Sequence, residues 1–134
     1  MEAKFKRNIG SLDGIFRFIS EAFVTLHIDT FFEPAIRLAA EELFTNLVKY
    51  NRKTLSDISI AINRDGPQLV LTMRDFGAED FDITKTKEVD VNLPLEKRTP
   101  GGLGIHLVKK IADRLEYRFS DGESRITLIK NLER

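Results

Sequence analysis

The spacing of apolar residues predicts two amphipathic helices in the first third of the chain. Over residues 11–28, apolar side chains recur every three or four positions, at Leu12, Ile15, Phe16, Ile19, Phe23 and Leu26. Ser11 stands where an N-cap is expected. Pro34 suits the first turn of a second helix, which extends to about Tyr50. The broad apolar face of this second helix comprises Ile36, Ala39, Ala40, Leu43, Phe44, Leu47 and Val48.

A β-hairpin is predicted next. Isoleucines at every second position from Ile58 to Ile62 indicate a strand that is buried on one face. A turn sequence at residues 63–67 follows, and a second apolar strand covers residues 69–73. The basic segment 1–8 is compatible with another strand.

Residues 78–100 are polar and lack a clear period. A connection of this length is usually a lid or a binding loop. A helix over residues 103–113 and a final hairpin over residues 115–130 follow it. Helices and strands are grouped rather than alternating, so we expect a single α+β domain. Its architecture would be a two-layer sandwich, in which helices cover one face of a mostly antiparallel sheet.

Composition narrows the class of protein. The chain has 134 residues, of which 42% are hydrophobic and 31% are charged, as expected for one folded domain. The 21 basic and 21 acidic residues cancel, which argues against binding to nucleic acid or an anionic membrane. There is no cysteine, so disulfides, thiolate zinc sites and cysteine nucleophiles are excluded. We see no signal peptide or membrane-spanning run and expect a cytoplasmic protein.

Polar residues on the second helix could carry chemistry. Glu42, Asn46 and Lys49 are three or four positions apart, so they share one helix face. Such a stripe is often only a solvated surface. In a functional interpretation, the Asn46 carbonyl oxygen would suit Mg²⁺ and Glu42 would orient or deprotonate a nucleophile. Lys49 would then meet a phosphate.

Asp75 and a glycine-rich segment add two further candidate features. Asp75 ends a strand before Phe76 and Gly77, and is either part of a turn or a buried acceptor for an amino group on a ligand base. Residues 99–104, Thr-Pro-Gly-Gly-Leu-Gly, lead directly into a helix. They form either an ordinary turn or a loop whose unpaired N–H groups bind phosphate.

Together these motifs resemble the ATP-binding domain of sensor histidine kinases, type II topoisomerases, ATP-driven chaperones and mismatch-repair ATPases. The segments 42–46, 75–82 and 101–110 most resemble the bacterial anti-sigma factor serine/threonine kinases. The resemblance covers essentially the whole chain and implies the Bergerat, or histidine-kinase-like, ATPase fold. It departs from the superfamily pattern at Glu79, where many members have a second glycine.

The resemblance implies roles for individual residues in binding ATP and Mg²⁺. Asn46 would hold the metal, and Glu42 would act as the catalytic base or the water-orienting group. Asp75 would bind the adenine amino group, and Gly77 would allow a close backbone approach beneath the base. Gly102 and Gly104 would let the lid over residues 78–100 and the helix N-terminus wrap the phosphates, and Lys49 or Arg98 would supply positive charge. The other expected nucleotide-binding residues are Thr99, Gly101 and Leu103.

The activity that the resemblance implies is phosphorylation of Ser or Thr on a small antagonist protein, together with sequestration of a regulator such as a sigma factor. It also suggests a homodimer, and Phe5 and Ile9 are compatible with an interface. Two alternatives stay open. One is a nucleotide-dependent binding module with little kinase activity, and the other is a detached histidine-kinase-like domain that phosphorylates a histidine on another chain.

Overall fold

The computed structural model describes residues 1–50, 56–76 and 102–133. The predicted lid over residues 78–100 lies outside these ranges. The helices and strands are β1 (Glu2–Phe5), α1 (Leu12–Thr25), α2 (Glu33–Tyr50), β2 (Ile58–Asp65), β3 (Gln68–Phe76), α3 (Gly102–Ile111), β4 (Arg114–Ser120) and β5 (Glu123–Asn131). Short 3₁₀ turns at Ile9–Ser11 and Thr30–Phe32 precede α1 and α2.

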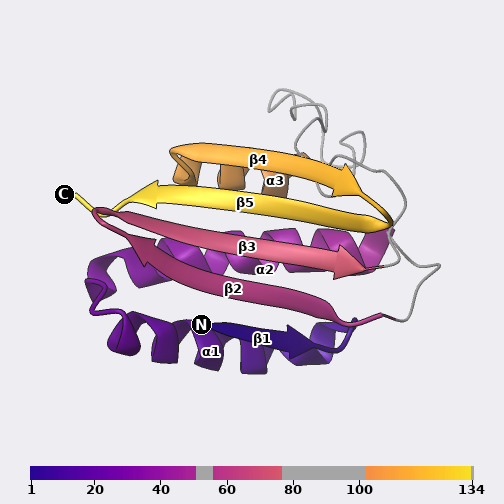
Figure 1. Ribbon diagram of the computed structural model, residues 1–134, viewed down its shortest axis with the longest axis horizontal. Helices are drawn as coiled ribbons and strands as arrows, with labels where there is room; N and C mark the ends of the chain where they lie inside the picture. The colour runs from indigo at the N-terminus through magenta and orange to yellow at the C-terminus, as the bar shows by residue number, and fades with distance from the viewer. Residues whose placement is uncertain (51–55, 77–101, 134) are drawn as a thin grey trace.

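The strands form one antiparallel sheet in the order β1-β2-β3-β5-β4. The helices α1, α2 and α3 all lie on one face of it, with α2 behind the central strands and α3 behind β4 and β5 (Figure 1). The expected two-layer α+β sandwich is therefore confirmed. Both predicted hairpins are present, and their turns contain Gly66 and Gly122 at φ values of 58° and 76°. These left-handed conformations explain why glycine occupies both turns.

Helix α2 is the centre of the core. It packs against α1 on one side and α3 on the other, and its predicted apolar face is buried against the sheet. Ile36, Leu43 and Phe44 are completely inaccessible to solvent. The alternation in β3 places Leu69, Leu71, Met73 and Asp75 on the same, helix-covered face. The core is thus continuous with the end of β3, where a charged residue takes the place of an apolar one.

Two details of α1 differ from the expectation. Ser11 occupies the N-cap position, but its side chain does not cap the helix; its hydroxyl donates instead to the Lys6 carbonyl oxygen at 2.7 Å. Phe16 lies outside the buried core, and the Arg37 guanidinium packs over its ring at 4.6 Å. Phe18 is buried in its place and contacts Phe5 edge-on. The regular spacing could not separate the two phenylalanines, because both fall near the edge of the apolar stripe.

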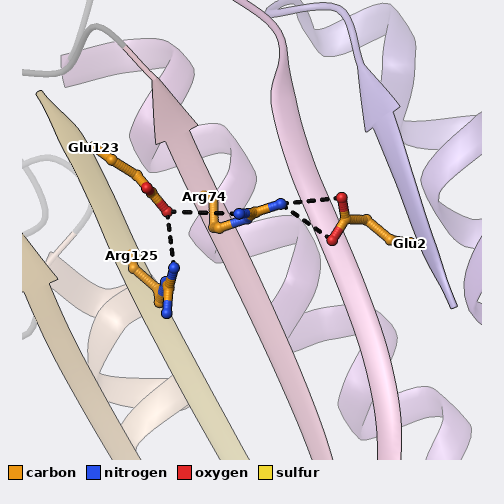
Figure 2. Close-up of polar contacts among 4 residues, drawn as sticks. All are labelled: Glu2, Arg74, Glu123 and Arg125. Carbon is orange, nitrogen blue, oxygen red and sulfur yellow. Dashed lines mark hydrogen bonds and ion pairs between the residues drawn. The ribbon is translucent and has the colours of Figure 1, made fainter.

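The face of the sheet away from the helices carries a charge network. Arg74 and Arg125 are directly opposite each other on β3 and β5, and like charges in such pairs repel. Glu2 accepts from Arg74 at 3.0 Å, while Glu123 lies 3.9 Å from Arg74 and 3.2 Å from Arg125 (Figure 2). The two acids thus offset the repulsion. Because these groups are partly solvated, the network adds little to stability.

Candidate functional site

The polar stripe on α2 is only partly solvated. Lys49 is exposed and Glu42 is half-buried, but Asn46 is only 4% exposed. The Asn46 Nδ2 atom donates to the Glu42 carbonyl oxygen, one helical turn earlier, at 2.6 Å. This bond orients the amide, and Oδ1 is the end that can serve a hard cation. A buried carboxamide in the middle of a helix is a stronger indication of a site than a surface stripe would be.

The Glu42 side chain lies directly over Gly104 in the first turn of α3. A Cβ atom placed on Gly104 would come within 2.8 Å of the Glu42 Cδ atom, and closer still to Oε2. No other residue type fits without moving the carboxylate, so glycine is required here for close approach rather than for backbone freedom. The sequence placed Glu42 and Gly104 in separate motifs, and the structure brings them together.

The packing around Glu42 changes its acidity. Burial disfavours the charged form and raises the pKa of the Glu42 carboxyl above its ordinary value of 4.5, and the nearby Glu41 carboxylate raises it further. A half-buried carboxyl with a raised pKa is a common property of a general base. The role of Glu42 as a catalytic base stays a prediction.

Asp75 lies at the end of β3 and is completely buried. It is a strand residue, so the interpretation of Asp75 as part of a turn is wrong. Its carboxylate forms a two-point ion pair with Arg7, in which Nη2 donates to Oδ1 and Nη1 donates to Oδ2 at 3.2 Å. Ser124, which lies opposite Asp75 on β5, is also buried. The end of the sheet under the helices is thus polar.

Arg7 and Ser124 were not identified from the sequence. A buried carboxylate needs a partner, so the burial predicted for Asp75 could have prompted a search for a cation. Nothing in the pattern distinguishes Arg7 from the other 20 lysines and arginines, however. The pairing joins residues 68 positions apart and depends on the fold alone.

Arg7 also places the two halves of the site next to each other. Its Nη1 atom donates to Asp75 and, at 3.4 Å, to the carbonyl oxygen of Leu47, the residue that follows Asn46. The Asp75 carboxylate and the backbone carbonyl that follows Asn46 therefore both contact one guanidinium. Arg7 thus links Asp75 to α2, which carries Asn46 and Glu42, and Glu42 lies over Gly104; we call these four residues, Asp75, Asn46, Glu42 and Gly104, the α2 site.

Other predicted residues are only partly described or lie outside the described ranges. Helix α3 begins at Gly102, so the glycine-rich segment does lead into a helix N-terminus, and Leu103 belongs to its first turn. Gly77, Arg98, Thr99 and Gly101 lie outside the described residues, and their roles stay predictions.

The described side chains set limits on other kinds of site. Among residues 1–50, 56–76 and 102–133, no three acidic or histidine side chains are grouped to hold a metal. In the same part of the chain, none of the helices is both long and apolar enough to cross a bilayer.

A hollow lined by Phe76, Arg118 and Arg125 lies at the other face of the sheet from Asp75, so it is separate from the α2 site.

Comparison with known proteins assigns the family. The family model described as "Histidine kinase-like ATPase domain" matches residues 7–130. The chain belongs to this family and has its Bergerat-type ATPase fold. No curated protein sequence matches the chain significantly.

Two solved structures share the fold. The RsbU and RsbW domains of Rv1364c from Mycobacterium tuberculosis align with a TM-score of 0.66 at 14% identity, over 100% of this chain and 32% of theirs. The Acinetobacter baumannii histidine kinase AdeS aligns with a TM-score of 0.56 at 11% identity, over 100% of this chain and 68% of its own. This chain thus spans about a third of the Rv1364c structure, and at these identities the likeness concerns the fold.

The approach of Glu42 to Gly104 yields a first prediction. In Gly104→Ala, the new methyl group takes the space of the carboxylate, which is the flexible end of its side chain and rotates toward solvent. The pKa of Glu42 should then fall back toward its ordinary value, measured by NMR titration of carboxyl-labelled glutamate. The stability should change by no more than about 1 kcal/mol, because alanine also favours the helix.

Gly14→Ala is the matched control. An added Cβ there meets only the Phe5 ring at 3.7 Å, an ordinary contact. It should leave the pKa of Glu42 unchanged. An unshifted pKa of Glu42 in Gly104→Ala would show that the two residues are not in close contact.

The raised pKa of Glu42 yields a second prediction about stability. Between pH 4.5 and the raised value, the folded chain binds more protons at Glu42 than the unfolded chain does, so stability decreases as pH rises through this window. Glu42→Gln removes the ionisation. It should therefore unfold at a higher temperature than the wild type at pH 7, and the gain should shrink below pH 4.5. Thermal unfolding followed by circular dichroism tests this, and a gain that is independent of pH would contradict it.

Proposed function

We propose that the chain is an ATP-binding serine/threonine protein kinase domain of the anti-sigma factor type. It would transfer the γ-phosphoryl group of Mg·ATP to a small antagonist protein and sequester a regulator such as a sigma factor. One observation supports this most directly: the Glu42 carboxylate lies over the first turn of α3, where unpaired backbone N–H groups attract phosphate.

The residues of the α2 site suit the parts of a nucleotide. Asp75 is a buried acceptor for the exocyclic amino group of a base, and a mismatched base would leave this charge unpaired. Asn46 offers an amide oxygen for Mg²⁺, which neutralises phosphate charge when it is bound. Gly104 allows Glu42 to approach α3 closely.

Transfer would need little covalent chemistry from the protein. The acceptor hydroxyl gives its proton to the Glu42 carboxylate as its oxygen forms a bond to the γ-phosphorus. The bond from that phosphorus to the β–γ bridging oxygen breaks, and ADP leaves with the electron pair. The raised pKa of Glu42 makes it a better proton acceptor than an ordinary carboxylate. Positioning and charge stabilisation supply most of the remaining rate.

The nucleotide assignment predicts a specific loss of binding. The wild type should bind Mg·ATP in a calorimetric titration, and Asp75→Asn should weaken binding by about tenfold or more, because an amide replaces the charged acceptor. Asp65→Asn, at the exposed end of β2, is the control and should bind like the wild type. Equal affinity in Asp75→Asn and the wild type would exclude Asp75 as the base-binding residue.

If the chain is a kinase, a substitution of Glu42 should abolish phosphate transfer without weakening ATP binding. In Glu42→Ala, transfer of label from γ-³²P-ATP to protein in an extract of the source cells should fall by about 100-fold or more, while ATP affinity is retained. The neighbouring Glu41→Ala should keep transfer. The transferred label should survive acid, as phosphoserine does. Full transfer by Glu42→Ala would reject the base assignment, and an acid-labile product would indicate phosphohistidine.

A further inference from the structure

The buried Arg7 guanidinium is the centre of the polar contacts at the end of the sheet. Arg7 follows β1, and its side chain is only 5% exposed. Its Nε atom donates to the Ser56 carbonyl oxygen at 3.1 Å, and Nη1 donates to the Leu47 carbonyl oxygen at 3.4 Å. Both terminal nitrogens also donate to Asp75. One side chain therefore ties together the segments before α1, at the end of α2, before β2 and at the end of β3.

We propose that Arg7 is the residue that positions Asp75 and thereby determines which nucleobase the α2 site accepts. The inference rests on the proposed nucleotide-binding function and adds a residue that lies outside all three sequence motifs. Arg7 acts through Asp75, so it is a positioning residue rather than a catalytic one.

The geometry of the ion pair explains how such selection works. A forked guanidinium that holds both oxygens of a carboxylate fixes the plane of the carboxylate as well as its place. An ionised carboxylate only accepts hydrogen bonds, because it has no proton to give, and each of its oxygens can accept more than one. Such a group accepts from the 6-amino group of adenine and repels the 6-oxo group of guanine. Discrimination by a charged, buried acceptor is strong, because the wrong base leaves it unpaired.

The cost of burial argues that the pair has more than a structural role. Asp75 is completely buried and Arg7 nearly so, and two apolar residues of similar size are often at least as stabilising as a buried ion pair. The contacts of Arg7 with the backbone at Leu47 and Ser56 also hold the carboxylate at a fixed place relative to α2. The base-reading and metal-binding ends of the site would thus keep a fixed separation.

The test compares the affinities of Mg·ATP and Mg·GTP by calorimetry in the wild type, Arg7→Lys and Arg7→Met. Lysine keeps the charge but replaces the fork with a point charge, and methionine removes both. Arg74→Met is the matched control, because Arg74 precedes Asp75 on the same strand but pairs with Glu2 on the opposite face (Figure 2). Thermal unfolding of each variant gives the structural effect separately.

The wild type should prefer ATP, and the ATP-to-GTP affinity ratio should fall by about tenfold or more in Arg7→Lys and further in Arg7→Met. Arg74→Met should keep the wild-type ratio. If Arg7→Met fails to fold, Arg7→Lys alone decides the test.

Three results would overturn the inference. Weaker binding of both nucleotides with an unchanged ratio would mean that Arg7 is only structural. Tighter ATP binding in Arg7→Met would mean that Arg7 competes with the base for Asp75. Absence of nucleotide binding by the wild type would reject the proposed function itself, and this inference with it.

Discussion

Helix α2 packs on several sides at once, and this packing determines both the core and the position of the candidate site. The helix packs against α1, α3 and the sheet, and the side chains on those sides are mostly apolar. A polar side chain can lie on a buried side of the helix only where a neighbouring group satisfies it. Asn46 meets this condition because its amide donates to the Glu42 carbonyl oxygen. The Glu42 carboxylate fits beside α3 because Gly104 has no side chain to occupy the same space. The core and the candidate site are consequently parts of the same packing arrangement.

The same constraint operates at the end of the sheet. The alternation in β3 puts Asp75 on the helix-covered face, where the core would otherwise have an apolar residue. A charge at that depth is tolerated because Arg7 supplies a forked partner and is itself bonded to two backbone carbonyl oxygens. Ion pairs on the opposite face, such as that of Arg74 with Glu2, are partly solvated and contribute much less to stability. The two faces of one strand therefore carry charge for different reasons.

The sequence was sufficient to predict the layers of the fold. Strict alternation from Ile58 to Ile62, helical spacing after Pro34 and glycines in both hairpin turns are local signals, and each corresponds to an element of the structure. The order of those elements then indicated the sandwich. Within the candidate site, Glu42, Asn46, Asp75 and Gly104 could be proposed from the sequence because they belong to short motifs, and their roles stay predictions. Arg7 was not identified from the sequence, because its place in the site depends on an ion pair with Asp75, a residue far away in the sequence. Phe16 and Phe18 were confused because a helical period resolves a face only to within about one residue.

If α2, the end of β3 and the first turn of α3 form one nucleotide site, a crystal structure of the chain with Mg²⁺ and a non-hydrolysable ATP analogue will show the nucleotide bound there. We expect the base amino group within hydrogen-bond distance of Asp75, the metal on the Asn46 amide oxygen, and the terminal phosphate beside Glu42 at the start of α3. A nucleotide bound elsewhere, or one whose base does not contact Asp75, would contradict this expectation.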